Sequence, residues 1–213
     1  AYTGYMSEDI CRKKFDGYYH DLLKLRKGMF APGNPDKLKV MQTTEGYPLS
    51  MNLLQKGYLT SQDLAAFPDR IDKKKTIHPI IECTQNIPCN PCQDICPKHC
   101  IAVGDDITQL PQIHQKVSCI GCGLCVANCP GQAIFLVERS EQFDRVTLPY
   151  EFLPLPESNE MGYGCDRSGR RICEAVVQSV KNVPANDHTT LLTLQVPAGM
   201  GNEVRFYKGR KDA

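Results

Sequence analysis

The sequence has little net charge and no long apolar run, and each absence narrows the class of protein. Its 25 Lys and Arg residues nearly balance 24 Asp and Glu residues, which gives a net charge of +1. Domains that bind nucleic acid are usually visibly basic, so this balance disfavours such a partner. Apolar runs such as residues 134–137 are far shorter than a membrane span, and the opening AYTGYMSEDI has no apolar signal core. We therefore expect a cytoplasmic protein that does not enter the membrane.

The sequence also lacks a nucleotide-binding loop. No G-x-G-x-x-G follows a predicted strand, and GYGCDRSG at residues 162–169 only looks like one. Such a loop lets backbone N–H groups approach the pyrophosphate of a dinucleotide. We therefore expect flavin or dinucleotide chemistry linked to this protein to lie on another chain.

Cysteine, in contrast, is abundant and unevenly distributed. Nine of the twelve cysteines lie between Cys83 and Cys129. The cysteines of a secreted disulfide scaffold would be spread along the chain, whereas Cys-x-x-Cys pairs in a reducing compartment indicate metal binding. The other three, Cys11, Cys165 and Cys173, lack chelating spacing, and we expect them to be free buried thiols.

The clustered cysteines form an internal repeat with an offset of 33 residues. The matching pairs are Cys89 and Cys122, Cys92 and Cys125, Cys96 and Cys129, Pro97 and Pro130, and Ile101 and Ile134. Five matches at one offset indicate the duplication of a short metal-binding unit.

The second copy, CIGCGLCVANCP at residues 119–130, has the spacing of bacterial 4Fe–4S ferredoxins. In that pattern the fourth cysteine binds the neighbouring cluster. Three closely spaced thiolates on a tight loop can bind three corners of one cubane, and the proline after the fourth cysteine prevents the loop from continuing as helix. Gly121 and Gly123 leave room for backbone N–H groups to approach the inorganic sulfides.

The first copy, CTQNIPCNPCQDICP at residues 83–97, departs from the repeat at one position. The offset predicts a cysteine where the chain has Asn86, and Cys83 lies three residues earlier. We predict that the loop is three residues longer and that Cys83 still supplies the ligand. One cluster would then be bound by Cys83, Cys89, Cys92 and Cys129. The other would be bound by Cys119, Cys122, Cys125 and Cys96.

Three alternatives to this ligand assignment remain open. Cys100 is equivalent to Ala133 in the second copy, and we expect Cys100 to be a buried residue beside a cluster. It could instead replace Cys83 as a ligand, or Cys83 could stay unbound and leave a three-iron cluster. A pair of zinc sites is the alternative without redox chemistry, although zinc sites rarely show interleaved units of this kind.

These patterns predict an α+β protein with a bacterial dicluster ferredoxin-like core and an extension on each side. Residues 1–78 are predicted to form a helical N-terminal extension and linker. Residues 79–137 are predicted to form the ferredoxin domain with two 4Fe–4S clusters, and residues 138–213 a small antiparallel β-sheet or barrel.

Local patterns predict elements within the N-terminal extension. Ser7 could cap a first helix, and a short helix over residues 49–56 should end at Gly57. Thr60 and Asp63 form a capping-box-like start for the next helix.

Strands are predicted around and after the cysteine units. The β-prone stretches at residues 79–83 and 133–139 should pair with each other. Residues 101–119 read as a strand, a turn and a return strand, and residues 166–169 as the turn of a hairpin.

The region from Tyr47 to Lys208 resembles a family of dicluster iron–sulfur subunits. They accompany FAD-dependent oxidoreductases acting on amino acids or related amines, such as proline dehydrogenase and opine or sarcosine oxidase-type assemblies. The motifs that carry the resemblance are MNLLQKGYLT, IECTQNIPCNPCQDICPKHCI, ITQLP, CIGCGLCVANCPGQAIFLV, and YEFLPLP leading into CDRSGRRICEAVVQSV. The cysteine units match any dicluster ferredoxin domain, whereas the Cys83-x5-Cys89 spacing and IPCNPC narrow the match.

The resemblance implies a non-catalytic electron-transfer subunit of an oxidoreductase complex. A partner carrying FAD or FMN would take two electrons from the substrate, and two 4Fe–4S clusters in this chain would relay single electrons between flavins or to an external acceptor. The implied assembly is a hetero-oligomer with flavoprotein subunits, and a small 2Fe–2S subunit is a further candidate partner.

The distribution of charge also favours a fixed subunit. A freely diffusing carrier often uses a strong electrostatic field to steer docking, whereas this chain has none and carries long extensions on both sides of its cysteine units. The alternatives are an independent dicluster ferredoxin, a relay subunit of a hydrogenase or of an aromatic or ether-bond reductase, and a structural or regulatory iron–sulfur module.

Overall fold

The computed structural model describes residues 53, 57–60, 63–64, 77–84, 86–114, 116–182, 184–186 and 189–210. The chain forms two units, Ala1–Glu45 and Gly46–Ala213, and all described residues belong to the second. The helix predicted to begin at Ser7, Cys11, and most of the N-terminal extension over residues 1–78 lie outside the described residues.

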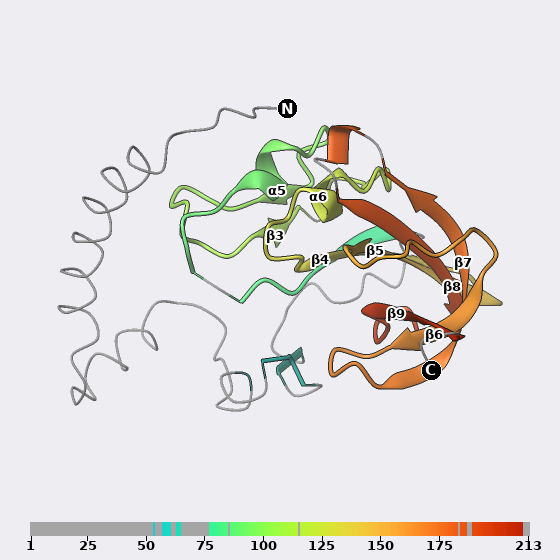
Figure 1. Cartoon of the computed structure of the whole chain (residues 1–213). Coiled ribbons are helices and arrows are strands. Elements are labelled where there is room, and N and C mark those ends of the chain that lie inside the picture. The colour runs from blue at the N-terminus through green and yellow to red at the C-terminus, as the bar shows by residue number, and fades with distance from the viewer. Residues whose placement is uncertain are drawn as a thin grey trace, which may run out of the picture. The chain divides into compact units, whose positions relative to one another are not determined.

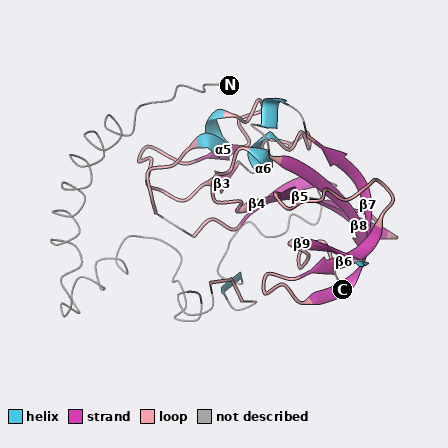
Figure 2. Ribbon diagram, viewed as in Figure 1, coloured by secondary structure: helices cyan, strands magenta, loops and turns pink. Residues whose placement is uncertain are grey.

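Antiparallel strands make up most of the regular secondary structure in the described chain, and the helices are few and short (Figures 1 and 2). The main sheet has seven strands in the order β1-β4-β5-β8-β7-β6-β9. Its strands are β1 (Ile77–Ile81), β4 (Ile134–Arg139), β5 (Phe143–Tyr150), β6 (Met161–Cys165), β7 (Arg171–Lys181), β8 (Thr190–Pro197) and β9 (Phe206–Gly209). The remaining elements are the paired strands β2 (Ile101–Ala102) and β3 (Gln112–Ile113), the helices α5 (Pro91–Asp94) and α6 (Leu124–Ala127), and the 3-10 turn η1 (Pro184–Asn186).

The core of the sheet follows from alternating apolar residues on its strands. Val146 and Leu148 of β5 are fully buried and lie opposite Leu194 and Leu192 of β8. Directly opposite residues in an antiparallel pair share one face of the sheet, so these side chains contact each other. The resulting apolar layer anchors the strands that carry the cysteine loops.

The predicted pairing of the strands that flank the cysteine units is confirmed. β1 pairs with β4 in antiparallel register, with Ile81 opposite Ile134, and β4 pairs in turn with β5. The boundary predicted after residue 137 falls inside β4, so residues before and after this boundary belong to one sheet. The division of the chain at residues 78 and 137 stays a prediction.

Two local predictions are confirmed in detail. Asp166 starts the turn between β6 and β7, where its carboxylate accepts the N–H of Ser168 at 2.8 Å and Gly169 has a φ of +80°. Thr60 and Asp63 form a reciprocal capping box, since the N–H of Thr60 donates to Oδ2 of Asp63 at 2.7 Å and the N–H of Asp63 donates to Oγ1 of Thr60 at 3.4 Å. Gly57, the predicted end of the preceding helix, donates its N–H to the carbonyl of Leu53 at 2.8 Å.

Within the described residues, no helix has the length and apolar character needed to span a membrane.

Candidate metal centre

The two cysteine units have the same backbone structure, at the offset of 33 residues seen in the sequence. α5 and α6 begin 33 residues apart, and each carries one buried cysteine, Cys92 or Cys125. After the helices, His99 and Gln132 adopt nearly the same left-handed conformation, with φ of 50° and 49°. A left-handed conformation is uncommon outside glycine, so its recurrence at equivalent positions shows that the duplication extends to the fold.

Backbone N–H groups point at the sulfur atoms of the cysteines that precede the two prolines. The N–H of Cys100 donates to Sγ of Cys96 at 3.2 Å, and the N–H of Ala133 donates to Sγ of Cys129 at 3.4 Å. At Cys96, such bonds favour the thiolate over the thiol. Burial alone would raise the pKa of Cys96, but the N–H groups of Cys100 and other following residues outweigh it and lower that pKa below its usual range.

We call the predicted ligands of the two clusters the first group, Cys83, Cys89, Cys92 and Cys129, and the second group, Cys96, Cys119, Cys122 and Cys125. Burial raises the pKa of Cys92 to about 11, and the next causes are the neighbouring charges of Cys129, Cys83 and Cys89. Cys129, from the second unit, is thus close enough to Cys92 for its charge to act on that thiol, and its role as a ligand of the first cluster stays a prediction. Three thiols of the group come from the first copy of the repeat and one from the second.

The second group contains the predicted ligands of the other cluster. Burial raises the pKa of Cys125 to about 12, with further contributions from Cys119, Cys122, Cys96 and then Cys92. The raised pKa keeps the Cys125 thiol protonated near neutral pH, so binding of a metal or cluster there would displace a proton. The helices that carry Cys92 and Cys125, α5 and α6, are in contact with each other.

A pocket opens onto the second group. It holds about 350 Å³ of space that protein atoms do not fill, part of it open to solvent. Its lining includes all four predicted ligands of this group, namely Cys96, Cys119, Cys122 and Cys125, and also Cys100.

The donor set of both groups fits an iron–sulfur cluster. All donors are cysteine sulfurs, the ligands that such clusters use, and every cysteine in the described part of the chain is free of a disulfide bond. Four thiolates around one zinc ion would lie within about 4 Å of each other. Among the described residues, no group of three or more His, Cys, Asp or Glu side chains is gathered closely enough to hold a single ion.

A left-handed glycine sets the geometry of the second loop. Gly123 has a φ of +82° and stands at the N-cap of α6, between Cys122 and Cys125. A Cβ at this position would lie 2.7 Å from Cδ1 of Leu191. Glycine therefore lets the chain turn sharply between two predicted ligands while staying close to the sheet.

Cys100, whose role the sequence leaves open, lies with the second group. It is buried, and the pKa of its thiol is raised to about 11, first by burial and then by its neighbours Cys96, Cys119 and Cys122. The neighbours that raise the pKa of Cys92 are instead Cys129, Cys83 and Cys89. This arrangement disfavours Cys100 as a replacement for Cys83 and fits a packing role in the second group.

The variant Cys100→Ala should keep its full iron content. The equivalent residue in the second copy is Ala133, and the second group has four thiols without Cys100. Iron analysis and EPR of the anaerobically purified variant are the measurements. Loss of a whole cluster would show that Cys100 is a ligand.

Asn86, which occupies the position where the repeat predicts a cysteine, is exposed. Its side-chain amide donates to the carbonyl of Thr108 at 3.1 Å and so ties the loop to the turn between β2 and β3. Cys83 is half-buried and lies near Cys92. The longer loop thus leaves Cys83 near Cys92, and its role as a ligand stays a prediction.

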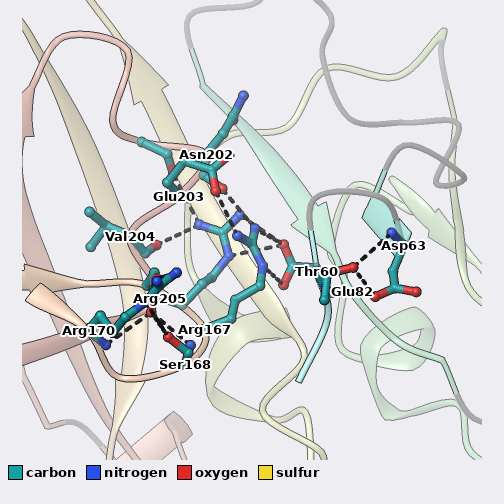
Figure 3. Close-up of polar contacts among 12 residues, drawn as sticks. Thr60, Asp63, Glu82, Arg167, Ser168, Arg170, Asn202, Glu203, Val204 and Arg205 are labelled. Carbon is teal, nitrogen blue, oxygen red and sulfur yellow. Dashed lines mark hydrogen bonds and ion pairs between the residues drawn. The ribbon is translucent and has the colours of Figure 1, made fainter. Parts of the chain in front are cut away.

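Beside Cys83 lies a charge network that sequence reasoning did not identify. The carboxylate of Glu82 accepts Nε of Arg167 at 2.8 Å and Nη2 of Arg205 at 2.9 Å (Figure 3). All three side chains are nearly buried, with exposed fractions of 7%, 9% and 4%. Burial alone would raise the pKa of Glu82, but the hydrogen bonds and positive charges of the two arginines lower it to about 2.

Acid should weaken this network only below the ordinary pKa of glutamate. Because the folded-state pKa of about 2 lies below the ordinary 4.5, ionised Glu82 contributes about 3 kcal/mol to stability. The contribution is present above pH 4.5 and is lost as the pH falls toward 2. A ¹³C NMR titration of the Glu82 carboxyl carbon should show it still ionised at about pH 3.5. A midpoint near 4.5 would contradict the network.

Comparison with known families identifies one region of the chain, the second cysteine unit. Residues 116–135 match the 4Fe–4S binding domain family (Fer4). The matched range contains Cys119, Cys122, Cys125 and Cys129. No curated protein and no solved structure matches the chain. A 4Fe–4S binding domain is therefore present, which supports an iron–sulfur protein of the ferredoxin type.

Proposed function

We propose that this chain relays single electrons through two 4Fe–4S clusters within a multi-subunit, flavin-dependent oxidoreductase. The observation that carries the proposal is that Cys96, from the first copy of the repeat, lines one pocket together with Cys119, Cys122 and Cys125 of the second. Each group takes three cysteines from one copy of the repeat and one from the other. Thiols interleaved in this way are typical of proteins that hold two clusters close together.

The residues around the thiols would protect and tune the clusters. When bound, each cluster would accept and pass on one electron at a time. Ile101, Val126 and Ile134 are buried in the apolar layer that contacts the cysteines, so they exclude water from one side of the site. The N–H groups of Cys100, Gly121 and Ala133 donate to ligand sulfurs, which stabilises negative charge there.

Exposed apolar residues beside both groups suit contact with a partner protein. Ile120, next to Cys119, is 56% exposed. Ile87 and Ile107 are 49% and 46% exposed, and the carbonyl of Ile107 accepts the N–H of Cys89 at 3.3 Å. Apolar side chains of this size at the mouth of an electron-transfer site favour a stable subunit contact. They support the relay subunit, as does the resemblance of the sequence to subunits of amino-acid and amine oxidoreductases.

The partner would supply the chemistry that this chain does not. A flavin accepts two electrons from a substrate together, whereas each cluster carries one. The two groups lie beside each other, so single electrons could pass between them inside one chain. We place FAD or FMN on partner subunits, with a small 2Fe–2S subunit as a further candidate member of the complex.

Anaerobic purification of the tagged chain from its own cells tests this function. We expect it to elute with a larger chain that carries flavin. Mixing the reduced flavoprotein with the oxidised tagged chain should bleach the visible absorbance of the clusters. A chain with Cys125→Ala should still bind the partner but accept fewer electrons. An iron-loaded chain that elutes alone and is not reduced by any flavoprotein fraction would favour an independent ferredoxin.

A further inference from the structure

Glu82, the residue before the predicted ligand Cys83, is held through both its main chain and its side chain. Its backbone N–H donates to the carbonyl of Ala133 at 2.7 Å, which continues the pairing of β1 with β4. Ala133 in turn donates its own N–H to Sγ of Cys129, at 3.4 Å. Through its main chain, Glu82 is therefore joined to the second copy of the repeat next to Cys129, a predicted ligand of the same cluster.

The side chain of Glu82 is held by two arginines that lie far away in the sequence. Arg167 belongs to the turn between β6 and β7, and Arg205 immediately precedes β9. Both guanidinium groups converge on the Glu82 carboxylate (Figure 3). The cysteine loop is thus tied to the C-terminal part of the sheet by contacts in which each side chain is nearly buried.

Both arginines are themselves fixed by further contacts. Arg167 donates Nη2 to the carbonyl of Asn202 at 2.8 Å and Nη1 to Glu203 at 3.2 Å. Arg205 donates Nη1 to the carbonyl of Gly201 at 3.1 Å and lies 4.6 Å from the centre of the Phe135 ring. Buried arginines with several partners lose little further freedom on binding a carboxylate, so they can hold Glu82 in one position.

The need for such an anchor differs between the two cysteine units. Five residues separate Cys83 from Cys89, whereas two separate Cys119 from Cys122. A longer loop has more conformations, and a thiol at its start is less constrained by the other ligands. Ser118, which precedes Cys119, has a short side chain and is exposed. The anchor therefore occurs in the unit whose first ligand lies on the longer loop.

We propose that the salt-bridged set of Glu82, Arg167 and Arg205 is a positioning device that holds Cys83 in place as a ligand of the first cluster and has no such role for the second. The inference rests on the proposed pair of clusters. It assigns to the C-terminal turns a role in completing a site whose ligands all come from residues 83–129. In this proposal none of the three side chains is a ligand. Each acts by fixing the position of Cys83.

Glu82→Gln is the test, because it keeps the size of the side chain and removes its charge. With about eight iron atoms in the wild-type chain, we expect about seven in the variant and a three-iron EPR signal before reduction. The signals of the second cluster should be unchanged. Cys83→Ala should have the same phenotype, and combining the two substitutions should cause no further loss of iron.

A matched control separates this role from a general effect of charge. Glu138 pairs with Arg145 at 3.0 Å, and both side chains are 39% exposed. Glu138→Gln should therefore leave both clusters intact. If Glu82→Gln does not fold, as judged by circular dichroism, Arg167→Lys keeps the charge but loses the forked contact, and it should show the same selective loss to a smaller extent.

The possible outcomes distinguish failure of this inference from failure of the proposed function. Two complete four-iron clusters in the wild type and in a folded Glu82→Gln variant would overturn the positioning role alone. Equal loss of both clusters in folded Glu82→Gln and Arg167→Lys variants would overturn it too, because the effect would not be specific to Cys83. A wild-type chain without two clusters would overturn the proposed function instead.

Discussion

Replacing Cys129 with alanine should remove iron from the cluster of the other cysteine unit. Cys129 follows Cys119, Cys122 and Cys125 in the sequence, but its charge acts on the thiol of Cys92, and we predict that it binds the first cluster. The variant should therefore lose or degrade the first cluster and keep the second. Iron content and the EPR spectrum of the dithionite-reduced protein are the measurements, with roughly four to seven iron atoms expected in place of about eight.

Cys96→Ala is the reciprocal variant. Cys96 belongs to the first unit, but its thiol lies near Cys125 of the second group. We expect the second cluster to be lost and the first to remain, so the residual EPR signals of the two variants should differ and together account for the wild-type spectrum. Identical residual spectra, or a Cys129→Ala variant that loses the cluster of its own unit, would rule out the interleaved assignment.

Arg205→Met should destabilise the protein strongly. The side chain of Arg205 is 4% exposed and pairs with Glu82 at 2.9 Å, so the substitution leaves a buried carboxylate with one arginine fewer. Removing one partner of a buried ion pair typically costs about 3–5 kcal/mol. For a chain of this size the midpoint of anaerobic thermal unfolding should fall by roughly 10 °C.

Arg145→Met is the matched control for that substitution. Arg145 also pairs with a carboxylate, Glu138 at 3.0 Å, and also lies over an aromatic ring, Phe143 at 4.9 Å. Its side chain is 39% exposed, however, and exposed pairs contribute about 1 kcal/mol or less. Similar losses for the two variants would show that burial of the Arg205 pair does not determine its contribution.

The elements that depend on neighbouring residues could be predicted from the sequence. The capping box of Thr60 and Asp63 and the hairpin turn that starts at Asp166 require only contacts within a few residues. The duplicated units also belong here, because each is built from closely spaced cysteines, a short helix and a proline. The crossover of Cys129 rests on the spacing typical of bacterial ferredoxins and stays a prediction.

The sheet and the charge network depend on contacts that no local pattern specifies. The alternation of apolar residues shows which face of a strand is buried, but not that β5 lies between β4 and β8. Arg167 and Arg205 lie 85 and 123 residues from Glu82. Their positions follow from the order of the strands. Glu82 lies between a buried strand and the predicted ligand Cys83. This position was the one local indication that its carboxylate has a buried, positively charged partner.

The most direct test of the central claim is the cluster content of the anaerobically purified chain. Iron, zinc and acid-labile sulfide are measured per chain, and EPR spectra are recorded before and after reduction with dithionite. Two adjacent clusters predict about eight iron and eight sulfide, with two interacting S = 1/2 signals in the reduced protein. Zinc in place of iron, or about four iron atoms with one isolated signal, would contradict two redox clusters in this chain.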